Sequence, residues 1–212
     1  MNNKNANEVR LHDYLNKNES KKLHIGCGSN LLEGWLNADY NIDSSDVFHL
    51  DATKIFPINA DSFDYIFSEH MIEHITYSQG LSMLNECRRI LKPGGRIRIT
   101  TPDLGFLIGL YAQNKSILQL NYINWASSNF IKNNIFTDTM IINNFVRDWG
   151  HLFIYDFKTI KHSLEMVGFI NVKSFLLNES TTPDFCNLEN EKRMPEGFLQ
   201  LESFTVEAQR PL

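Results

Sequence analysis

The chain has 212 residues, of which 42% are hydrophobic, and this length suits one sizeable domain better than two. Its formal net charge of -5 excludes a general basic surface, so we expect neither nucleic acid nor an anionic membrane as a partner. We expect a cytoplasmic protein with reduced thiols, because the three cysteines lack metal-type spacing and the N-terminus is polar. The sequence also has no apolar run near the roughly 18 residues that a membrane span needs.

The N-terminal third contains the first strand signals. Residues 1–20 are polar and predict an arm with a short helix around residues 11–15, ahead of a domain that covers 21–212. Hydrophobic segments that end in polar residues then predict strands. Five segments of this kind lie at residues 22–26, 35–39, 47–51, 63–68 and 96–101.

An amphipathic helix is predicted between the fourth and fifth of these strands. Leu81, Leu84, Cys87 and Leu91 recur at spacings of three and four, and Pro93-Gly94-Gly95 ends the pattern. A helical crossover of this length implies that the two strands that it joins are parallel.

The C-terminal half predicts a helical insertion and the end of a sheet. Residues 104–149 are rich in aromatic residues, and we expect them to form a cap over a substrate-binding pocket. A helix is predicted from Asp156 to Gly168, and strands at 169–177 and 201–208 would close the sheet as an edge hairpin. The predicted fold is α/β, a Rossmann-like, doubly wound and mostly parallel seven-stranded sheet with a helical cap.

Polar residues at three strand ends indicate a nucleoside cofactor. Gly26-Cys27-Gly28 follows the first strand, where glycine lets the backbone approach a ligand closely. Asp39 ends the second strand, in a position to bind both ribose hydroxyls. Asp51 ends the third, where it could accept a hydrogen bond from an adenine amino group, and the small Ala52 that follows would leave room for the ring. The alternative is that both aspartates only form strand-end turns.

The order of these motifs resembles that of the class I S-adenosylmethionine-dependent methyltransferases. The matching pieces are IGCGSN, the aspartate of NADYN, LDA, FDYIFSEHMIEH, LKPGG, Gly150-His151 and EMVGFINV, over about residues 20–175. The closest resemblance is to small bacterial enzymes of the methyltransferase-11 type, which are found with sugar and surface-polysaccharide pathways.

This resemblance implies S-adenosylmethionine as the cofactor and assigns residues to its parts. Gly26, Cys27 and Gly28 would border the methionine part, Asp39 would hold the ribose, and Asp51 with Ala52 the adenine. Ser68 and Glu69 would lie beside the sulfonium. About eight residues separate Gly28 from the second strand, which is too short for the usual full helix.

The segment His70-Met-Ile-Glu73-His74 offers a base and a metal site. Read as H-x-x-E-H it is an inverted zinc-protease signature, which its place in the methyltransferase order argues against. The spacing predicts His70, Glu73 and His74 on one side of one helical turn. Ubiquinone-pathway and small-RNA 2′-O-methyltransferases look similar here, with His151 matching a later histidine. That resemblance implies a divalent metal on His70, Glu73, His74 and His151; the alternative is that Glu73 and His74 only stabilise the helix start.

Without a metal, His70 or His151 is the preferred general base, because imidazole titrates near neutrality. Asp103 is a second candidate base, although capping of the following helix is the stronger interpretation. Arg147 could bind an anionic acceptor or lie on the surface in solvent.

We therefore predict a methyltransferase that transfers a methyl group from S-adenosylmethionine to an oxygen of a small-molecule acceptor, such as a sugar, a sugar nucleotide or a phosphorylated metabolite. Two alternatives remain open: a non-catalytic nucleotide-binding protein on the same fold, and a metal-dependent hydrolase built on His70, Glu73 and His74. The acceptor, the choice between O- and N-methylation, and the oligomeric state are left open by the sequence.

Overall fold

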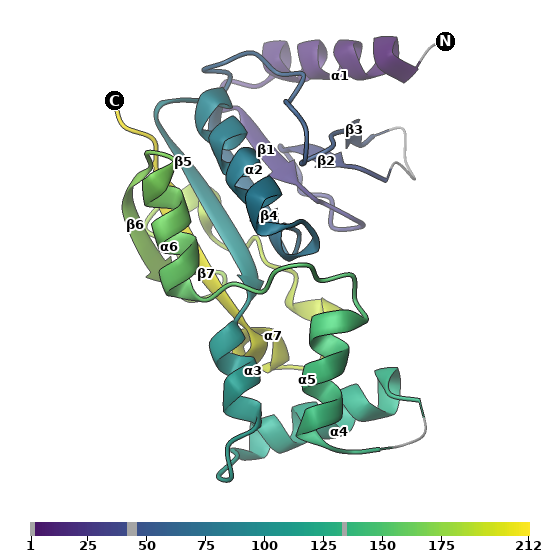
Figure 1. Ribbon diagram of the computed structural model, residues 1–212. Coiled ribbons are helices and arrows are strands. Elements are labelled where there is room, and N and C mark those ends of the chain that lie inside the picture. Colours follow the sequence, from purple (N-terminus) through teal and green to yellow (C-terminus); the bar gives the residue numbers. More distant parts are fainter. Residues whose placement is uncertain (1–2, 42–45, 133–134) are drawn as a thin grey trace.

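The computed structural model describes residues 3–41, 46–132 and 135–212, and its upper part is a seven-stranded sheet (Figure 1). The strand order is β3-β2-β1-β4-β5-β7-β6, and β7 alone runs antiparallel to its neighbours. The predicted α/β fold with a mostly parallel sheet is therefore confirmed. The strands are β1 (Lys22–Ile25), β2 (Leu36–Asp39), β3 (Phe48–His49), β4 (Phe63–Glu69), β5 (Leu91–Pro102), β6 (Ile170–Phe175) and β7 (Ser203–Gln209).

Four strands differ from their predicted extents or connections. β3 has two residues, so most of the predicted strand 47–51 is loop. β5 is longer than predicted, because Leu91 already pairs with Phe63. β6 and β7 pair antiparallel as expected, but the long segment 176–202 joins them in place of a tight hairpin, and β7 lies between β5 and β6.

One face of the sheet is covered by helices α2 (Tyr77–Ile90) and α6 (Phe157–Met166), which lie side by side in front of it in Figure 1. Thr76 and Gln79 form a capping box at the start of α2, and Asp156 caps α6 as predicted. Helix α1 (Asn3–Lys17) is longer than the predicted short helix, and the Tyr14 hydroxyl ties it to β1 by accepting from the Lys22 amide at 2.8 Å.

The opposite face carries the connection 176–202, with two short 3-10 helices, η2 (Pro183–Phe185) and η3 (Glu191–Arg193). Arg98 of β5 is fully buried there and donates to both carboxylate oxygens of Glu189, at 2.7 and 3.0 Å. It also donates to Glu207 at 2.6 Å. A buried charge is tolerated when it is paired and hydrogen-bonded, so this network holds the connection on the sheet.

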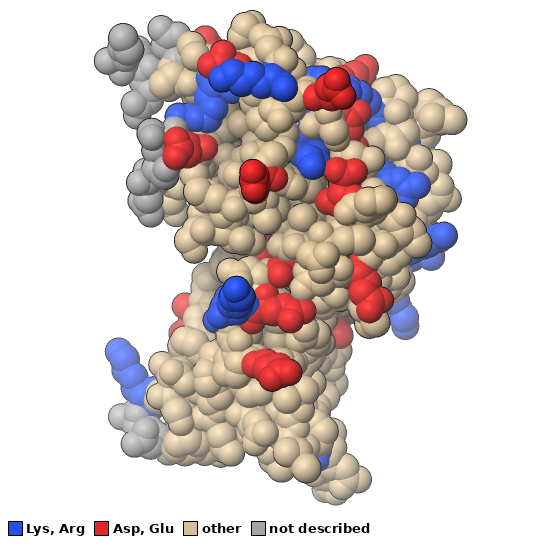
Figure 2. Space-filling model, turned by 180° about the vertical axis from the view of Figure 1, so that it is seen from behind, with Lys and Arg blue, Asp and Glu red and all other residues tan. Residues whose placement is uncertain are grey.

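Four helices form a lower lobe with its own hydrophobic cluster (Figure 1). They are α3 (Leu104–Leu110), α4 (Ile117–Phe130), α5 (Asp138–Arg147) and α7 (Phe198–Glu202). Residues 104–149 thus pack with α7, which sequence analysis did not place in this lobe. Figure 2 shows few charged side chains on the face of the lower lobe seen from behind. None of the helices in the described residues is long and apolar enough to cross a membrane.

Candidate active site

A cavity of about 420 Å³ lies at the carboxyl ends of β1 and β2 and beside the loop after β3. It brings together Gly26, Asp39, Asp51 and Ala52, four residues that the sequence predicted to share one site. Its other lining residues are Ile25, Tyr40, Leu50, Thr53, Met71, His74 and Ile75. The cavity therefore combines a glycine without a side chain and two carboxylates with apolar walls, a composition that fits an adenosine.

Asp39 is held by the chain on both of its carboxylate oxygens. The Gly28 amide donates to Oδ2 and the Asn41 amide donates to Oδ1, each at 2.9 Å. Each carboxylate oxygen can accept a second hydrogen bond, so two ribose hydroxyls can still be bound. Asp39 forms a strand-end turn and also faces the cavity, so the two interpretations of this residue are compatible.

Asp51 has one carboxylate oxygen taken by a turn. Its Oδ1 accepts from the amide and from the hydroxyl of Thr53, at 2.9 and 2.7 Å. The hydrogen bond from the Thr53 side chain is the main cause that lowers the pKa of Asp51, which keeps this carboxylate an acceptor at neutral pH. Oδ2 accepts no hydrogen bond from the described residues, so it can accept one from an exocyclic amine.

Gly26 is required where the chain turns from β1 into the loop. Its φ is +72°, and a Cβ there would lie 2.4 Å from Cγ of Met71. Its amide donates to the carbonyl of Ala38 at 2.8 Å, which joins the glycine loop to β2. No helix follows Gly28 before β2, as the short spacing predicted, so the side chain of Met71 lies against the loop.

The remaining predicted cofactor residues do not line this cavity. Cys27 is buried, and burial raises the pKa of its thiol to about 11, so it stays neutral. Gly28 contacts the site through Asp39 alone. Ser68 is buried without a hydrogen-bond partner in the described residues. Glu69 accepts from the Asn190 amide at 3.1 Å and so supports the connection 176–202.

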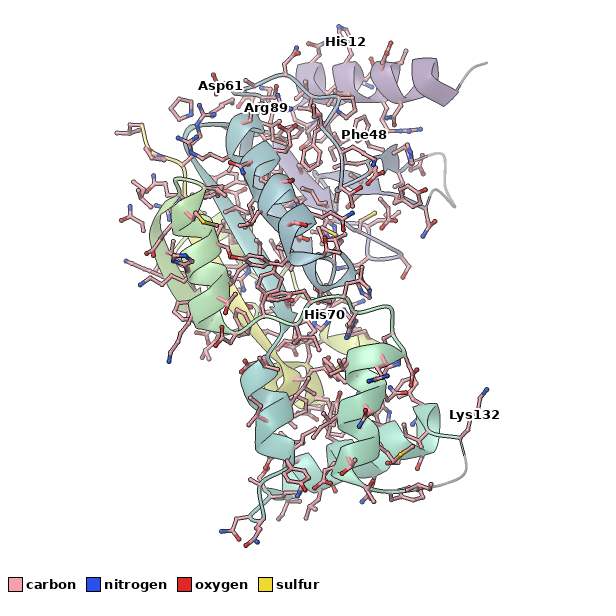
Figure 3. All side chains as sticks on the ribbon, viewed as in Figure 1. His12, Phe48, Asp61, His70, Arg89 and Lys132 are labelled. Carbon is pink, nitrogen blue, oxygen red and sulfur yellow. The ribbon has the colours of Figure 1, made fainter. Side chains whose placement is uncertain are left out.

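A second cavity of about 220 Å³ lies where the sheet meets the lower lobe, at the position of His70 in Figure 3. His74 lines both cavities, so the second one adjoins the first. Its other lining residues are His70, Glu73, Pro102, Trp125, Phe130, Phe145, Trp149, His151, Arg193, Met194 and Glu202. The wall is mainly aromatic, with titratable groups gathered on one side.

Glu73, His74 and His151 form a cluster whose potential ligand atoms lie within 4.8 Å of one another. The Leu152 amide donates to the Glu73 carbonyl at 2.7 Å, and this hydrogen bond holds the neighbouring His151 close to His74. Each imidazole meets a backbone carbonyl with its Nδ1, at 2.6 Å for His151 and 3.4 Å for His74. Both Nε2 atoms are then left as acceptors, a pattern common in metal-binding histidines.

Burial sets the charges of this cluster. Glu73 is fully buried, and desolvation raises its pKa to about 8. Its Oε2 accepts from the Thr101 hydroxyl at 3.1 Å, while Oε1 has no hydrogen-bond partner in the described residues. Desolvation also lowers the pKa of His74, and that of His151 to about 4, so both imidazoles are neutral at physiological pH. An orphaned carboxylate oxygen between two neutral imidazoles fits a divalent metal.

The expectation that His70 shares a helical turn with Glu73 and His74 is wrong. The helix there is the 3-10 turn η1 (Ile72–His74), and His70 precedes it with a φ of +47°. In this left-handed conformation Nε2 of His70 meets the Ser203 hydroxyl at 2.8 Å, while Nδ1 lies 3.4 Å from Glu73 Oε1. His70 is a buried neighbour of the cluster and not one of its three members.

Asp103 and Arg147 line neither cavity. Asp103 caps α3, accepting from the Gly105 amide at 2.8 Å, and Arg147 is exposed in the last turn of α5. Sequence analysis missed Met71, Arg193 and Glu202 as cavity residues. Met71 lies within the HMIEH motif and could have been noted, whereas the other two come from a connection that carries no motif.

Comparison with known proteins now identifies the domain. Residues 23–99 match the family model described as a methyltransferase domain, a segment that runs from β1 into β5. This segment of the chain is therefore similar to a methyltransferase domain. S-Adenosylmethionine is therefore the cofactor that the domain implies, and the residues of the first cavity fit it. A comparison with curated proteins gave no match.

Solved structures share the fold of this methyltransferase domain over nearly the whole chain. A SAM-dependent methyltransferase from Archaeoglobus fulgidus is 17% identical, with a TM-score of 0.52, over 95% of this chain and 92% of that one. One from Mesorhizobium loti is 15% identical, with a TM-score of 0.51, over 97% and 98%. A possible exported protein from Bordetella parapertussis is 11% identical, with a TM-score of 0.55, over 97% and 67%. At these identities the likeness shows the fold alone.

Proposed function

We propose that this methyltransferase methylates a hydroxyl oxygen of a small molecule, of the class of sugars, sugar nucleotides or phosphorylated metabolites, in the cytoplasm. The observation that carries the proposal is the position of His74, which lines both the cavity with Gly26, Asp39 and Asp51 and the smaller cavity beside it. A donor in the first and an acceptor in the second would meet at this side chain. Proximity of this kind can contribute about 7–11 kcal/mol to a group transfer.

In this proposal the first cavity binds the cofactor, which supplies a methyl group already activated as a sulfonium. Asp39 accepts from the ribose hydroxyls, and the free Oδ2 of Asp51 accepts from the adenine amino group. Gly26 lets the backbone come close to the ligand. Cys27, Gly28, Ser68 and Glu69 act by shaping the strand ends around the cavity, because they do not line it themselves.

A hydroxyl acceptor must lose a proton, and the second cavity offers two neutral bases. The Nε2 atoms of His151 and His74 are acceptors, because each Nδ1 faces a backbone carbonyl. The lowered pKa values of both imidazoles keep them unprotonated at neutral pH. His151 is our preferred base, because the 2.6 Å contact to the Phe145 carbonyl orients its ring firmly.

In the alternative with a bound metal, a divalent ion would be held by Glu73, His74 and His151, and His151 would then be a ligand in place of the general base. Two nitrogens and one carboxylate oxygen suit zinc or manganese better than magnesium. Such an ion would lower the pKa of a bound hydroxyl and so favour its deprotonation. His70 and Asp103 have their own partners, and we assign them supporting roles in place of the predicted catalytic ones.

The second cavity also limits the acceptor. At about 220 Å³ it is smaller than the roughly 300–1,000 Å³ of pockets that bind drug-sized ligands. One hydroxylated ring fits this space, so a sugar nucleotide would place its nucleotide outside. We propose that residues 104–149, together with α7, cap this cavity and set its specificity, since Trp125, Phe130, Phe145 and Trp149 supply its walls.

The proposal is tested by screening hydroxylated small molecules for conversion of S-adenosylmethionine to S-adenosylhomocysteine. We expect turnover with a hydroxyl acceptor, a loss of at least about 100-fold with His151→Ala, and unchanged turnover with His162→Ala, an exposed histidine on α6. Turnover that survives His151→Ala would refute the assigned base. Tight zinc binding without affinity for S-adenosylhomocysteine would favour the hydrolase instead.

A further inference from the structure

Among the residues that the structure describes, Arg193 is the only arginine or lysine that lines the second cavity. Its side chain makes no hydrogen bond and no ion pair with any residue in 3–41, 46–132 or 135–212. It is exposed at the end of η3, so it retains contact with solvent while facing the cavity. A guanidinium is charged at all physiological pH values and presents a fork of N–H donors. Arg193 therefore has unused donors at the cavity.

The turn that carries Arg193 is fixed to two strands by buried polar contacts. Glu189 accepts two hydrogen bonds from Arg98 and one from the Thr100 hydroxyl at 2.7 Å, all on β5. The next residue, Asn190, donates its amide to Glu69 at the end of β4 and accepts from the Lys192 amide at 3.2 Å. The sheet thus fixes the position of η3 at the cavity. An arginine that only lies in solvent would not require such a fixed position.

The two carboxyl groups of the cavity already have other partners. Glu73 accepts from the Thr101 hydroxyl and lies against His70 and His74, at 3.4 and 4.0 Å. Glu202 accepts a short hydrogen bond from the Tyr122 hydroxyl. Neither of them forms an ion pair with Arg193 in the described residues; its charge only partly offsets the burial that raises the pKa of both carboxyl groups, so its N–H donors are left for a ligand.

The rest of the wall can hold a flat or apolar surface. Phe130 and Trp149 meet edge to face at 5.0 Å between ring centroids, and Trp125 meets Phe130 at 5.3 Å. Aromatic rings stack on planar molecules and on the apolar faces of sugars. The cavity therefore pairs an apolar wall with the guanidinium of Arg193, which has no hydrogen-bond partner in the described part of the chain.

We propose that Arg193 binds an anionic group of the acceptor, a carboxylate or a phosphate, and so selects a hydroxylated ring that carries one over its neutral counterpart. The inference rests on the proposed function, because it assigns the second cavity to the acceptor. It narrows the acceptor to the phosphorylated or acidic members of the proposed class. A guanidinium can bind a carboxylate or a phosphate through two parallel hydrogen bonds, so Arg193 can recognise either group in the same way.

The test measures the binding of three probes of one shape to the protein loaded with S-adenosylhomocysteine, by calorimetry. Benzoate and phenyl phosphate carry the two anions, and benzyl alcohol is the neutral control. We expect at least one anion to bind about tenfold more tightly than the alcohol, as a charge-assisted hydrogen bond contributes about 1.5–3 kcal/mol. The tighter of the two anions identifies carboxylate or phosphate as the preferred group.

Arg193→Gln should remove this preference, and Arg193→Lys should retain part of it, because the charge stays while the fork is lost. Lys192→Gln is the matched control, since Lys192 is the exposed neighbour outside the cavity lining and makes the same change in charge. Equal binding of all three probes, no binding of either anion, or equal effects of the Arg193 and Lys192 variants would overturn the inference. Affinity for S-adenosylhomocysteine itself should be the same in all variants, and its absence in the wild type would refute the proposed function instead.

Discussion

Replacing Glu73 with glutamine should stabilise the metal-free protein, increasingly so as the pH rises. Glu73 is fully buried, and its pKa is raised from 4.5 to about 8 by desolvation. As the pH rises above 4.5, the unfolded chain releases this proton while the folded chain keeps it. The contribution of Glu73 to stability is therefore fully present below pH 4.5 and is lost as the pH approaches 8. Glutamine has nearly the same shape and no proton to lose.

The size of the effect follows from the pKa. Each pKa unit corresponds to about 1.36 kcal/mol, so ionising Glu73 in the folded state costs on the order of 4–5 kcal/mol. Between pH 5 and pH 8, the free energy of unfolding of Glu73→Gln relative to wild type should rise by roughly 3–4 kcal/mol. The Gln side-chain oxygen can still accept from Thr101, so this hydrogen bond adds little to the difference.

Urea unfolding of both proteins at several pH values, with a chelator present, measures this difference directly. Comparing the two proteins at each pH cancels the other titrating groups, such as Glu202, whose pKa burial raises to about 7. Glu165→Gln on α6 is the control, because Glu165 is an exposed carboxylate and its removal should change stability by less than about 0.5 kcal/mol at every pH. A stability difference between Glu73→Gln and wild type that does not change with pH would refute the account of Glu73 as a buried, protonated acid.

Three further outcomes follow from the site and the fold. Zinc or manganese should raise the melting temperature of the wild type, and more strongly toward pH 8, because Glu73 then ionises. His151→Ala should abolish this rise in melting temperature, whereas His70→Ala should retain it. An equal loss of the rise in both variants would contradict the three-residue cluster. Gly26→Ala should weaken binding of S-adenosylhomocysteine in calorimetry by at least about tenfold, because a Cβ collides with Met71, and adding Met71→Ala should restore part of it. Arg98→Ala should lower the free energy of unfolding in urea by about 3–5 kcal/mol, since Glu189 and Glu207 would be left buried without their partner; a loss below 1 kcal/mol would show that the network is dispensable.

The strand order and the position of the first cavity could be predicted because local patterns determine them. Hydrophobic segments ending in Gly26, Asp39 and Asp51 are strand signals with polar ends, and parallel strands bring such ends to one edge of the sheet. The helix 77–91 carried a regular apolar spacing, and the structure has it at Tyr77–Ile90.

The second cavity depends on contacts between distant segments, and there the sequence was less informative. His70 has a positive φ and its Nε2 meets Ser203, a contact between distant segments that no spacing rule predicts, while its Nδ1 stays beside Glu73. Arg193 reaches the cavity only because Arg98 and Glu69 hold its turn from two strands. The connection 176–202 has no periodic pattern, so its role in covering the sheet could not be read from its residues alone.

Calorimetry with S-adenosylhomocysteine tests the central claim, that the first cavity binds the adenosine of the cofactor. We predict one binding site per chain in the wild type, a loss of about tenfold to hundredfold in affinity for Asp39→Ala, and no change for Asp13→Ala, an exposed aspartate on α1. Absence of binding to the wild type, or equal affinities for all three proteins, would contradict it.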